Sequence, residues 1–96
     1  MILEENLKDA IIGKNNTKRK YELFAEKAKA EGYNTISFLF NAIARAESIH
    51  VKNHLKALSV LKRKDFNASA FVTIDEQKLK ERVKDTRSNL VDAMEL

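Results

Sequence analysis

Apolar residues recur at steps of four and three along the first thirty positions of the chain. The positions of this stripe are Leu3, Leu7, Ala10, Lys14, Thr17, Tyr21, Phe24 and Ala28. All but Lys14 and Thr17 are apolar or aromatic, and the spacing places them on one face of a helix. The chain has no proline and two glycines, so a long helix can run unbroken. The pattern predicts a first helix from about Leu3 to Glu31, ended by Gly32.

A second stripe begins after the short stretch "GYNT". Asn34 or Thr35 can cap this helix, because a short side-chain oxygen accepts hydrogen bonds from free backbone N–H groups. We expect the helix to run from about Ile36 to Lys62 and to form an antiparallel hairpin with the first. Its stripe is Ile36, Leu39, Phe40, Ile43, Glu47, His50, His54, Ala57, Leu58 and Leu61.

In the remaining third of the chain, the sequence pattern predicts a connector at 63–72 and one further helix. Phe66, Phe71 and Val72 suggest that the connector packs on the hairpin. "TIDE" at 73–76 has the pattern of a capping box, in which Thr73 and Glu76 satisfy each other's backbone N–H groups. The third helix then runs to near the C-terminus. Its inward positions are Leu79, Val83, Thr86, Leu90 and Ala93, and "QKLKERV" (77–83) repeats the pattern of "ENLKDAI" (5–11).

Length and composition narrow the class of protein. With 96 residues we expect a single domain, 1–96. The absence of cysteine excludes disulfides, cysteine-bound zinc and iron–sulfur clusters. The net charge of +4 lies in separated clusters with few aromatic residues, so we expect no nucleic-acid partner. No signal peptide or membrane-spanning run is present, which predicts a cytoplasmic protein without a membrane partner.

Glu47 and His50 interrupt the apolar stripe of the second helix. They lie about 300° apart around the helix, so both point into the same sector. A buried carboxylate needs a partner charge or a metal, and Glu-x-x-His on a core face binds iron in four-helix di-iron proteins. The alternative is a partly exposed pair that bonds neighbouring side chains. A third possibility is zinc, held by Glu47 with His50 and His54, which lie one turn apart.

Residues 5–58 resemble the first hairpin of the rubrerythrin family. The landmarks are "NL" at 6–7, Gly13, Tyr21, "FAEKAKAEGY" (24–33), "LF" (39–40) and "AESIHVKNH" (46–54). The resemblance implies a ferritin-like four-helix bundle around a di-iron or mixed iron–zinc site. Many such proteins reduce hydrogen peroxide with electrons from a rubredoxin-type iron centre. Glu47 and His50 match the metal ligands of the second helix, and Tyr21 is expected as a core aromatic.

The chain departs from the family pattern at several ligand positions. The family places a metal-binding glutamate directly after the first glycine, where this chain has Lys14. The equivalent position on the third helix is Thr86, with Asn89 one turn later. A shift of one residue offers Asp85, although the apolar phase argues against it. The fourth helix and the rubredoxin-type centre are missing. We therefore expect a truncated, all-α, ferritin-like bundle of a hairpin plus a third helix, completed by oligomerisation or domain swapping.

Two functional interpretations follow from these departures. In the first, two chains pair as a homodimer, and two copies of Glu47 and His50 build a reduced iron site. The protein is then a rubrerythrin-type peroxidase or ferroxidase only if this site assembles between chains. In the second, the Lys14 ammonium pairs with Glu47 and replaces the metal. The chain is then a non-catalytic assembly or partner-binding module. This interpretation predicts a Lys14–Glu47 contact within salt-bridge distance.

Overall fold

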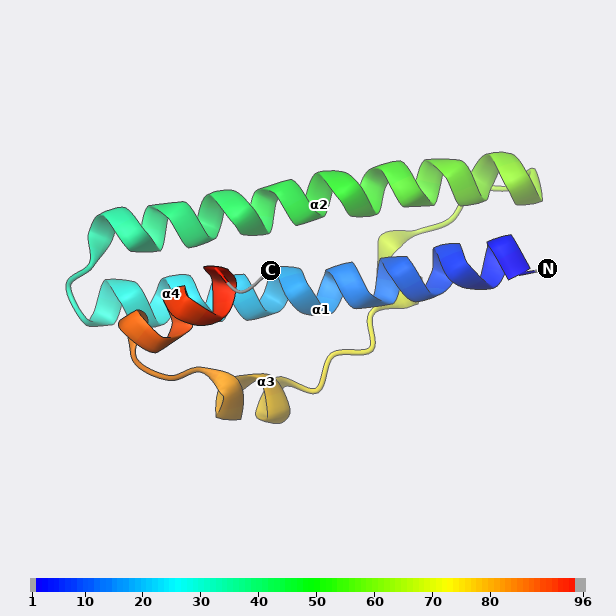
Figure 1. The fold of residues 1–96 in the computed structure, drawn as a ribbon. Helices are drawn as coiled ribbons and strands as arrows, with labels where there is room; N and C mark the ends of the chain where they lie inside the picture. Colours follow the sequence, from blue (N-terminus) through cyan, green and yellow to red (C-terminus); the bar gives the residue numbers. More distant parts are fainter. Residues whose placement is uncertain (1, 95–96) are drawn as a thin grey trace.

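Two long antiparallel helices dominate the molecule (Figure 1). The computed structural model describes residues 2–94, apart from the side chain of Ala68. Helices α1 (Ile2–Ala30) and α2 (Asn34–Lys62) have 29 residues each and lie side by side along a molecule of 47 × 23 × 23 Å. A 3-10 turn η1 (Ala68–Phe71) and two short helices, α3 (Glu76–Arg82) and α4 (Thr86–Met94), follow. The described residues contain no strand, which confirms the all-α prediction, and the arrangement is consistent with a ferritin-like helical fold.

The reversal between α1 and α2 is completed by two backbone hydrogen bonds. Gly32 adopts φ +86°, a left-handed conformation that glycine reaches without steric cost. The Tyr33 N–H donates to the Ala28 carbonyl at 2.8 Å, and the Gly32 N–H donates to the Lys29 carbonyl at 3.1 Å. This pair of bonds is the Schellman arrangement, which satisfies carbonyls at a helix end.

Helix α2 begins two residues earlier than the sequence predicts. Its N-cap residue is Tyr33, which makes no side-chain capping hydrogen bond. The expected capping by Asn34 or Thr35 is therefore wrong. Because Gly32 and Tyr33 already complete the reversal, Asn34 and Thr35 lie within the first turn of α2.

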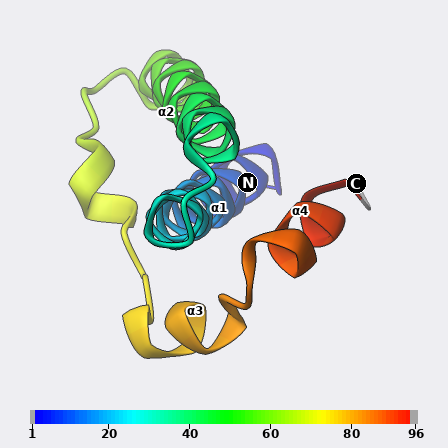
Figure 2. The same cartoon turned by 90° about the vertical axis from the view of Figure 1, so that its left-hand side faces the viewer.

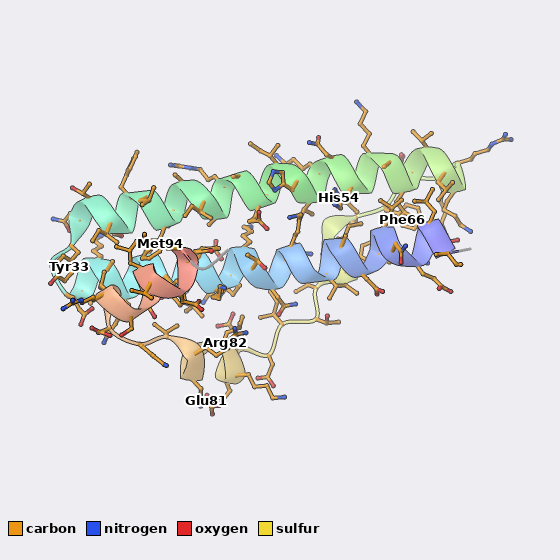
Figure 3. All side chains as sticks on the ribbon, viewed as in Figure 1. Tyr33, His54, Phe66, Glu81, Arg82 and Met94 are labelled. Carbon is orange, nitrogen blue, oxygen red and sulfur yellow. The ribbon has the colours of Figure 1, made fainter. Side chains whose placement is uncertain are left out.

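The hairpin core consists of two apolar clusters. One contains Tyr21, Phe24, Ala25, Ala28, Phe40 and Ala44, and the other contains Ile11, Val51, Leu55 and Leu58. Phe66 and Phe71 pack on the second cluster, as expected for the connector, whereas Val72 is 49% exposed. In Figure 3, Tyr33 lies at the hairpin turn and Phe66 lies near the start of α1.

The buried face of α2 is rotated by about one residue from the predicted stripe. The buried positions are Ser37, Phe40, Ala44, Val51, Leu55 and Leu58. Leu39 is 48% exposed and Ala57 is exposed, whereas Phe40 and Leu58 are fully buried. The predicted stripe thus straddles the face that contacts α1 and a flank that no described helix covers.

The predicted third helix is two helices separated by residues 83–85. Val83 adopts an extended conformation, and the Asn89 side chain exchanges two 2.9 Å hydrogen bonds with the backbone of Lys84. These bonds replace the helical hydrogen bonds that a continuous helix would make there. The expected inward positions are otherwise correct: Leu79 and Thr86 are buried, and Val83, Leu90 and Ala93 pack on the first cluster. Residues 95–96, the end of the predicted helix, lie outside the described residues.

The capping box predicted at 73–76 is not formed. Asp75 caps α3, and its carboxylate accepts a hydrogen bond from the Lys78 N–H at 3.1 Å. Glu76 is drawn away because it binds Arg19 on α1, with Nε and Oε1 2.5 Å apart. A tertiary ion pair has therefore taken the place of the local cap.

Helices α3 and α4 lie beside α1 and make no close backbone contact with α2 (Figure 2). One flank of α2 is consequently left without a neighbouring helix among residues 2–94. None of the described helices is long and apolar enough to cross a membrane.

Candidate functional site

Lys14 on α1 and Glu47 on α2 meet across the hairpin. The Lys14 Nζ lies 3.5 Å from the Glu47 Oε2. The Lys14 side chain is 33% exposed and the Glu47 side chain 13% exposed, so the contact is partly shielded from water. This contact confirms the salt bridge predicted from the sequence and places it within one chain.

His50 contacts the second carboxylate oxygen of Glu47. Its Nδ1 lies 3.0 Å from the Glu47 Oε1, as the spacing of three residues on a helix allows. An ionised carboxylate only accepts hydrogen bonds, so the imidazole donates from Nδ1 in this contact. The His50 side chain is 48% exposed. Each carboxylate oxygen of Glu47 therefore faces a nitrogen of another side chain.

The other ligand candidates do not join this group. His54 is half-buried, one turn further along α2. Asp85 is exposed at the start of α4, where hydrogen bonds with Ser88 lower the pKa of its carboxyl. Thr86 is buried, and both its N–H and its Oγ1 hydroxyl donate to the Glu31 Oε1, at 2.7 and 2.6 Å. Thr86 thus holds α4 to the end of α1.

Tyr21 is a core aromatic, as expected. It is 2% exposed, and its ring lies against those of Phe24 and Phe40 with centroid distances of 5.7 and 6.0 Å. Burial raises the pKa of the Tyr21 hydroxyl above its usual range, and Asp92 and Glu47 raise it further.

Two asparagines in the middle of α1 have a role that the sequence analysis missed. The Asn15 Nδ2 donates to the Phe71 carbonyl at 3.3 Å, and the Asn16 Nδ2 donates to the Thr73 carbonyl at 3.2 Å. Both bonds hold the connector against the hairpin. The available signal was two adjacent asparagines within a helix, since asparagine is a poor helix former.

The residues around Glu47 do not fit a di-iron centre within one chain. Across residues 2–94, no three His, Cys, Asp or Glu side chains gather closely enough to bind a metal ion. The zinc group of Glu47, His50 and His54 is therefore not assembled in the described part of the chain. Lys14 adds to the mismatch, because a protonated ammonium has three donors and no lone pair for a metal.

Comparisons with known proteins bear on the origin of this arrangement. A family model described as rubrerythrin matches residues 5–96. Nigerythrin from Nitratidesulfovibrio vulgaris is 49% identical over 47 residues, which cover 49% of this chain and 23% of nigerythrin. Rubrerythrin-1 from Clostridium acetobutylicum is 38% identical over 55 residues, which cover 57% of this chain and 28% of that protein.

The matched stretch thus spans only about a quarter of the length of either relative. No solved structure matches the chain. The family model, however, covers nearly all of it, from the start of α1 through α4. The chain belongs to the rubrerythrin family.

Proposed function

We propose that this chain is a non-catalytic helical module for assembly, in which Lys14 replaces the metal of the family. The observation that carries the proposal is the contact of Lys14 with Glu47, with Nζ and Oε2 3.5 Å apart. The ammonium lies where the family resemblance requires another carboxylate. It supplies positive charge to the carboxylate that a metal ion would otherwise neutralise.

Charge balance explains why Glu47 can be retained without a metal. A shielded carboxylate is costly unless it is paired and hydrogen-bonded. Glu47 is 13% exposed and receives Lys14 on one oxygen and His50 on the other. The hairpin therefore keeps its Glu-x-x-His pattern as a polar crosslink between α1 and α2.

Metal analysis of the purified protein tests this proposal. Protein prepared under conditions that retain iron is expected to contain far less than one metal ion per chain. The Lys14→Glu variant restores a carboxylate beside Glu47 and is expected to raise iron affinity. Lys18→Glu is the matched control, because it makes the same change of charge one turn later, at a lysine that lines a separate groove and forms no ion pair with Glu47. Stoichiometric iron in the unaltered protein would contradict the proposal.

The partner of the module is proposed to be a second copy of the chain. The flank of α2 that carries Leu39, Ile43 and His50 is largely uncharged, and α3 and α4 make no close backbone contact with α2. Leu39 is 48% exposed there, whereas Ile43 is already half-covered by the core. Two hairpins packed through this flank form four long helices around a shared interior.

A second candidate function is the oxidoreductase activity of the family's ancestry. Family membership and the retained Glu47–His50 pair favour it. A pair of chains could bring two copies of each residue together, which would supply four ligands for iron or for iron with zinc. This candidate predicts that iron binds in proportion to dimer and that the loaded dimer consumes peroxide or oxidises iron(II). If neither iron binding nor oxidation activity is found in the dimer, the oxidoreductase candidate is excluded and the assembly role is favoured.

A further inference from the structure

The outer face of α2 combines exposed apolar and basic side chains. Phe38, Ile49 and Val60 are 68%, 57% and 75% exposed, and they recur every eleven residues. The exposed cations Arg45, Lys52 and Lys56 lie between and beside them. At 3.6 residues per turn, all six fall within about 80° of the helix circumference and extend about 33 Å along it.

Positive charge on this face is not balanced by neighbouring acids. Glu47 is the one acidic residue of α2, and it points to Lys14 on another side of the helix. None of the three cations Arg45, Lys52 and Lys56 forms an ion pair within the described residues, whereas Lys8, Arg19, Lys20 and Lys62 each do.

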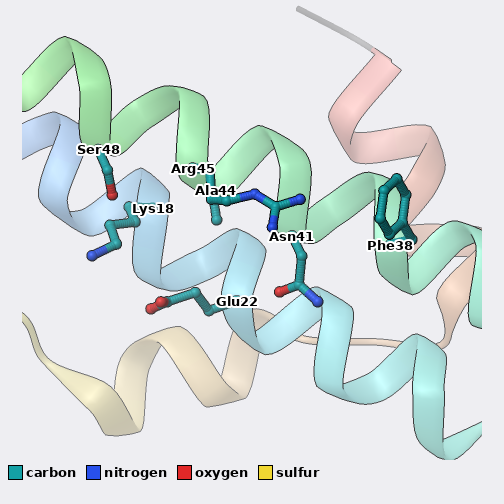
Figure 4. Close-up of a pocket in the computed structure, with 7 residues that line it drawn as sticks. All are labelled: Lys18, Glu22, Phe38, Asn41, Ala44, Arg45 and Ser48. Atoms are coloured by element: carbon teal, nitrogen blue, oxygen red, sulfur yellow. The ribbon is translucent and has the colours of Figure 1, made fainter.

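A groove between α1 and α2 borders the turn end of this face (Figure 4). The Arg45 guanidinium lies 5.9 Å from the centre of the Phe38 ring, so the first cation and the first apolar residue of the face are in contact. Glu22 is the acidic residue in the groove, and it pairs with Arg19 on α1 at 3.6 Å. The residues that line the groove are Lys18, Glu22, Phe38, Asn41, Ala44, Arg45 and Ser48.

The face is also free of covering elements among the described helices. Helices α3 and α4 make close backbone contacts with α1 and none with α2, and in the end view neither lies on the side of α2 that points away from α1 (Figure 2). The opposite side of α2 is fixed by Phe40, Val51 and Leu58 in the hairpin core. A straight helix held in this way can present one side to a flat partner.

We propose that the outer face of α2 binds an anionic lipid surface. Lysine and arginine beside a negatively charged leaflet are attracted to its phosphate groups, and apolar side chains can enter the boundary between headgroups and acyl chains. An anionic lipid surface would contact both the basic and the apolar side chains of this face. A nucleic acid would use the cations, but Ile49 and Val60 cannot stack on bases.

This inference revises one expectation from the sequence. The expectation of no membrane partner depended on the lack of a segment that could span the bilayer, and a surface contact needs no such segment. Arg45, Lys52 and Lys56 are spread through the sequence of α2 and come together only through its helical phase, whereas the basic residues at 18–20 and 62–64 are contiguous in the sequence.

Vesicle co-sedimentation of the full chain tests the proposal. Binding is expected to phosphatidylcholine vesicles that contain phosphatidylserine, to be weak to phosphatidylcholine alone, and to fall with added salt. The triple variant Arg45→Gln, Lys52→Gln, Lys56→Gln should lose about a hundredfold in affinity for the anionic vesicles. The matched control is Lys29→Gln, Lys78→Gln, Lys84→Gln, which removes the same charge from exposed positions elsewhere.

A second pair of variants separates the apolar contribution from the charge. Ile49→Ser with Val60→Ser should weaken vesicle binding severalfold, whereas Val72→Ser with Val91→Ser should not. All four positions are about half or more exposed, so the helical circular dichroism should be retained.

Several outcomes would overturn the inference. Equal losses of vesicle affinity in the two glutamine triple variants would show that only the net charge of the chain matters. Absence of binding to anionic vesicles at low salt would show that the outer face of α2 does not bind lipid. Binding to duplex or single-stranded nucleic acid without binding to vesicles would assign the face to the other partner. None of these outcomes depends on metal content, so a failure here is distinguishable from a failure of the proposed function.

Discussion

The Lys14–Glu47 pair offers a test of charge pairing at the scale of single residues. Lys14→Met leaves Glu47 with His50 alone, and Glu47→Gln leaves the Lys14 ammonium without its carboxylate. Because Lys14 is a third exposed, each change should cost about 1–2 kcal/mol of unfolding free energy, less than for a fully buried pair. The double variant should cost clearly less than the sum of the two.

Urea denaturation followed by circular dichroism measures these free energies. Lys18→Met serves as the control for the loss of a lysine that forms no ion pair within residues 2–94, and it should shift stability by less than about 0.5 kcal/mol. Additive effects of Lys14→Met and Glu47→Gln would mean that the two side chains do not interact in solution.

Individual site residues were predictable only where helical phase and the family resemblance together constrained them. Helical phase placed Lys14 and Glu47 on inward stripes, and the resemblance to the rubrerythrin family placed them opposite each other, so their contact could be predicted. Glu31 and Thr86 are 55 residues apart, and nothing periodic connects them. Polar contacts between distant segments depend on the tertiary arrangement, which is why the roles of Glu31 and Asn15 emerged only from the structure.

Among the elements, the two glycines of the chain are expected to respond in opposite directions to alanine. Gly32→Ala places a Cβ on a residue with φ +86°, which should destabilise the hairpin by about 1 kcal/mol. Gly13 lies within α1 and has open space where the alanine Cβ would lie, so Gly13→Ala should stabilise the helix by about 0.5–1 kcal/mol. Thermal unfolding of both variants gives the comparison, and equal signs would contradict the assigned backbone roles.

The break between α3 and α4 depends on Asn89. Its side chain is 1% exposed and forms both hydrogen bonds with Lys84. Asn89→Leu removes them and leaves the Lys84 N–H and carbonyl without partners, at a cost of about 1–3 kcal/mol. Hydrogen exchange of the α4 amides is expected to accelerate in this variant, while those of α1 and α2 remain protected. Unchanged exchange in α4 would show that Asn89 does not hold the break.

Long elements were predictable and their details were not. The repeated stripes predicted α1 and α2 to within two residues at each end, because 29 residues give many consistent apolar positions. The short α3 and α4 give few, so one continuous helix fitted the pattern equally well. The rotation of α2 was also missed, since Ile36, Leu39 and Ile43 on its open flank are as apolar as the contact face.

At the scale of the whole molecule, the carboxylates of Glu31 and Glu76 connect the C-terminal helices to the hairpin, beside the ion pair of Lys20 with Asp92. Hydrogen bonds from Thr86 lower the pKa of Glu31, and the hydrogen bond from Arg19 lowers the pKa of Glu76. A carboxyl whose pKa is lower in the folded state stabilises it above the unfolded pKa of about 4.3. That contribution is lost as the pH falls through the folded pKa.

Acid is therefore expected to release α3 and α4 before the hairpin unfolds. Limited proteolysis at pH values below about 4 should cleave residues 73–94 while α1 and α2 stay intact. Glu31→Gln should make this region susceptible already at neutral pH and flatten the pH dependence. Simultaneous loss of all helices with acid would argue against separate attachment.

The open flank of α2 leads to the last prediction, which concerns assembly. If a second copy covers this flank, the chain sediments as a dimer at micromolar concentration. Leu39→Lys places a charge on the covered side and should weaken the dimer at least about tenfold, because an unpaired charge is costly to bury. Phe38→Lys is the matched control: this neighbouring side chain is also large, apolar and exposed, but it points about 100° away, onto the outer face. Phe38→Lys should leave the dimer intact. Sedimentation equilibrium across a range of concentrations measures the dimer dissociation constant of both variants. A stable monomer of the unaltered chain, or equal weakening of the dimer by the two lysine substitutions, would contradict the proposal that a second copy covers this flank.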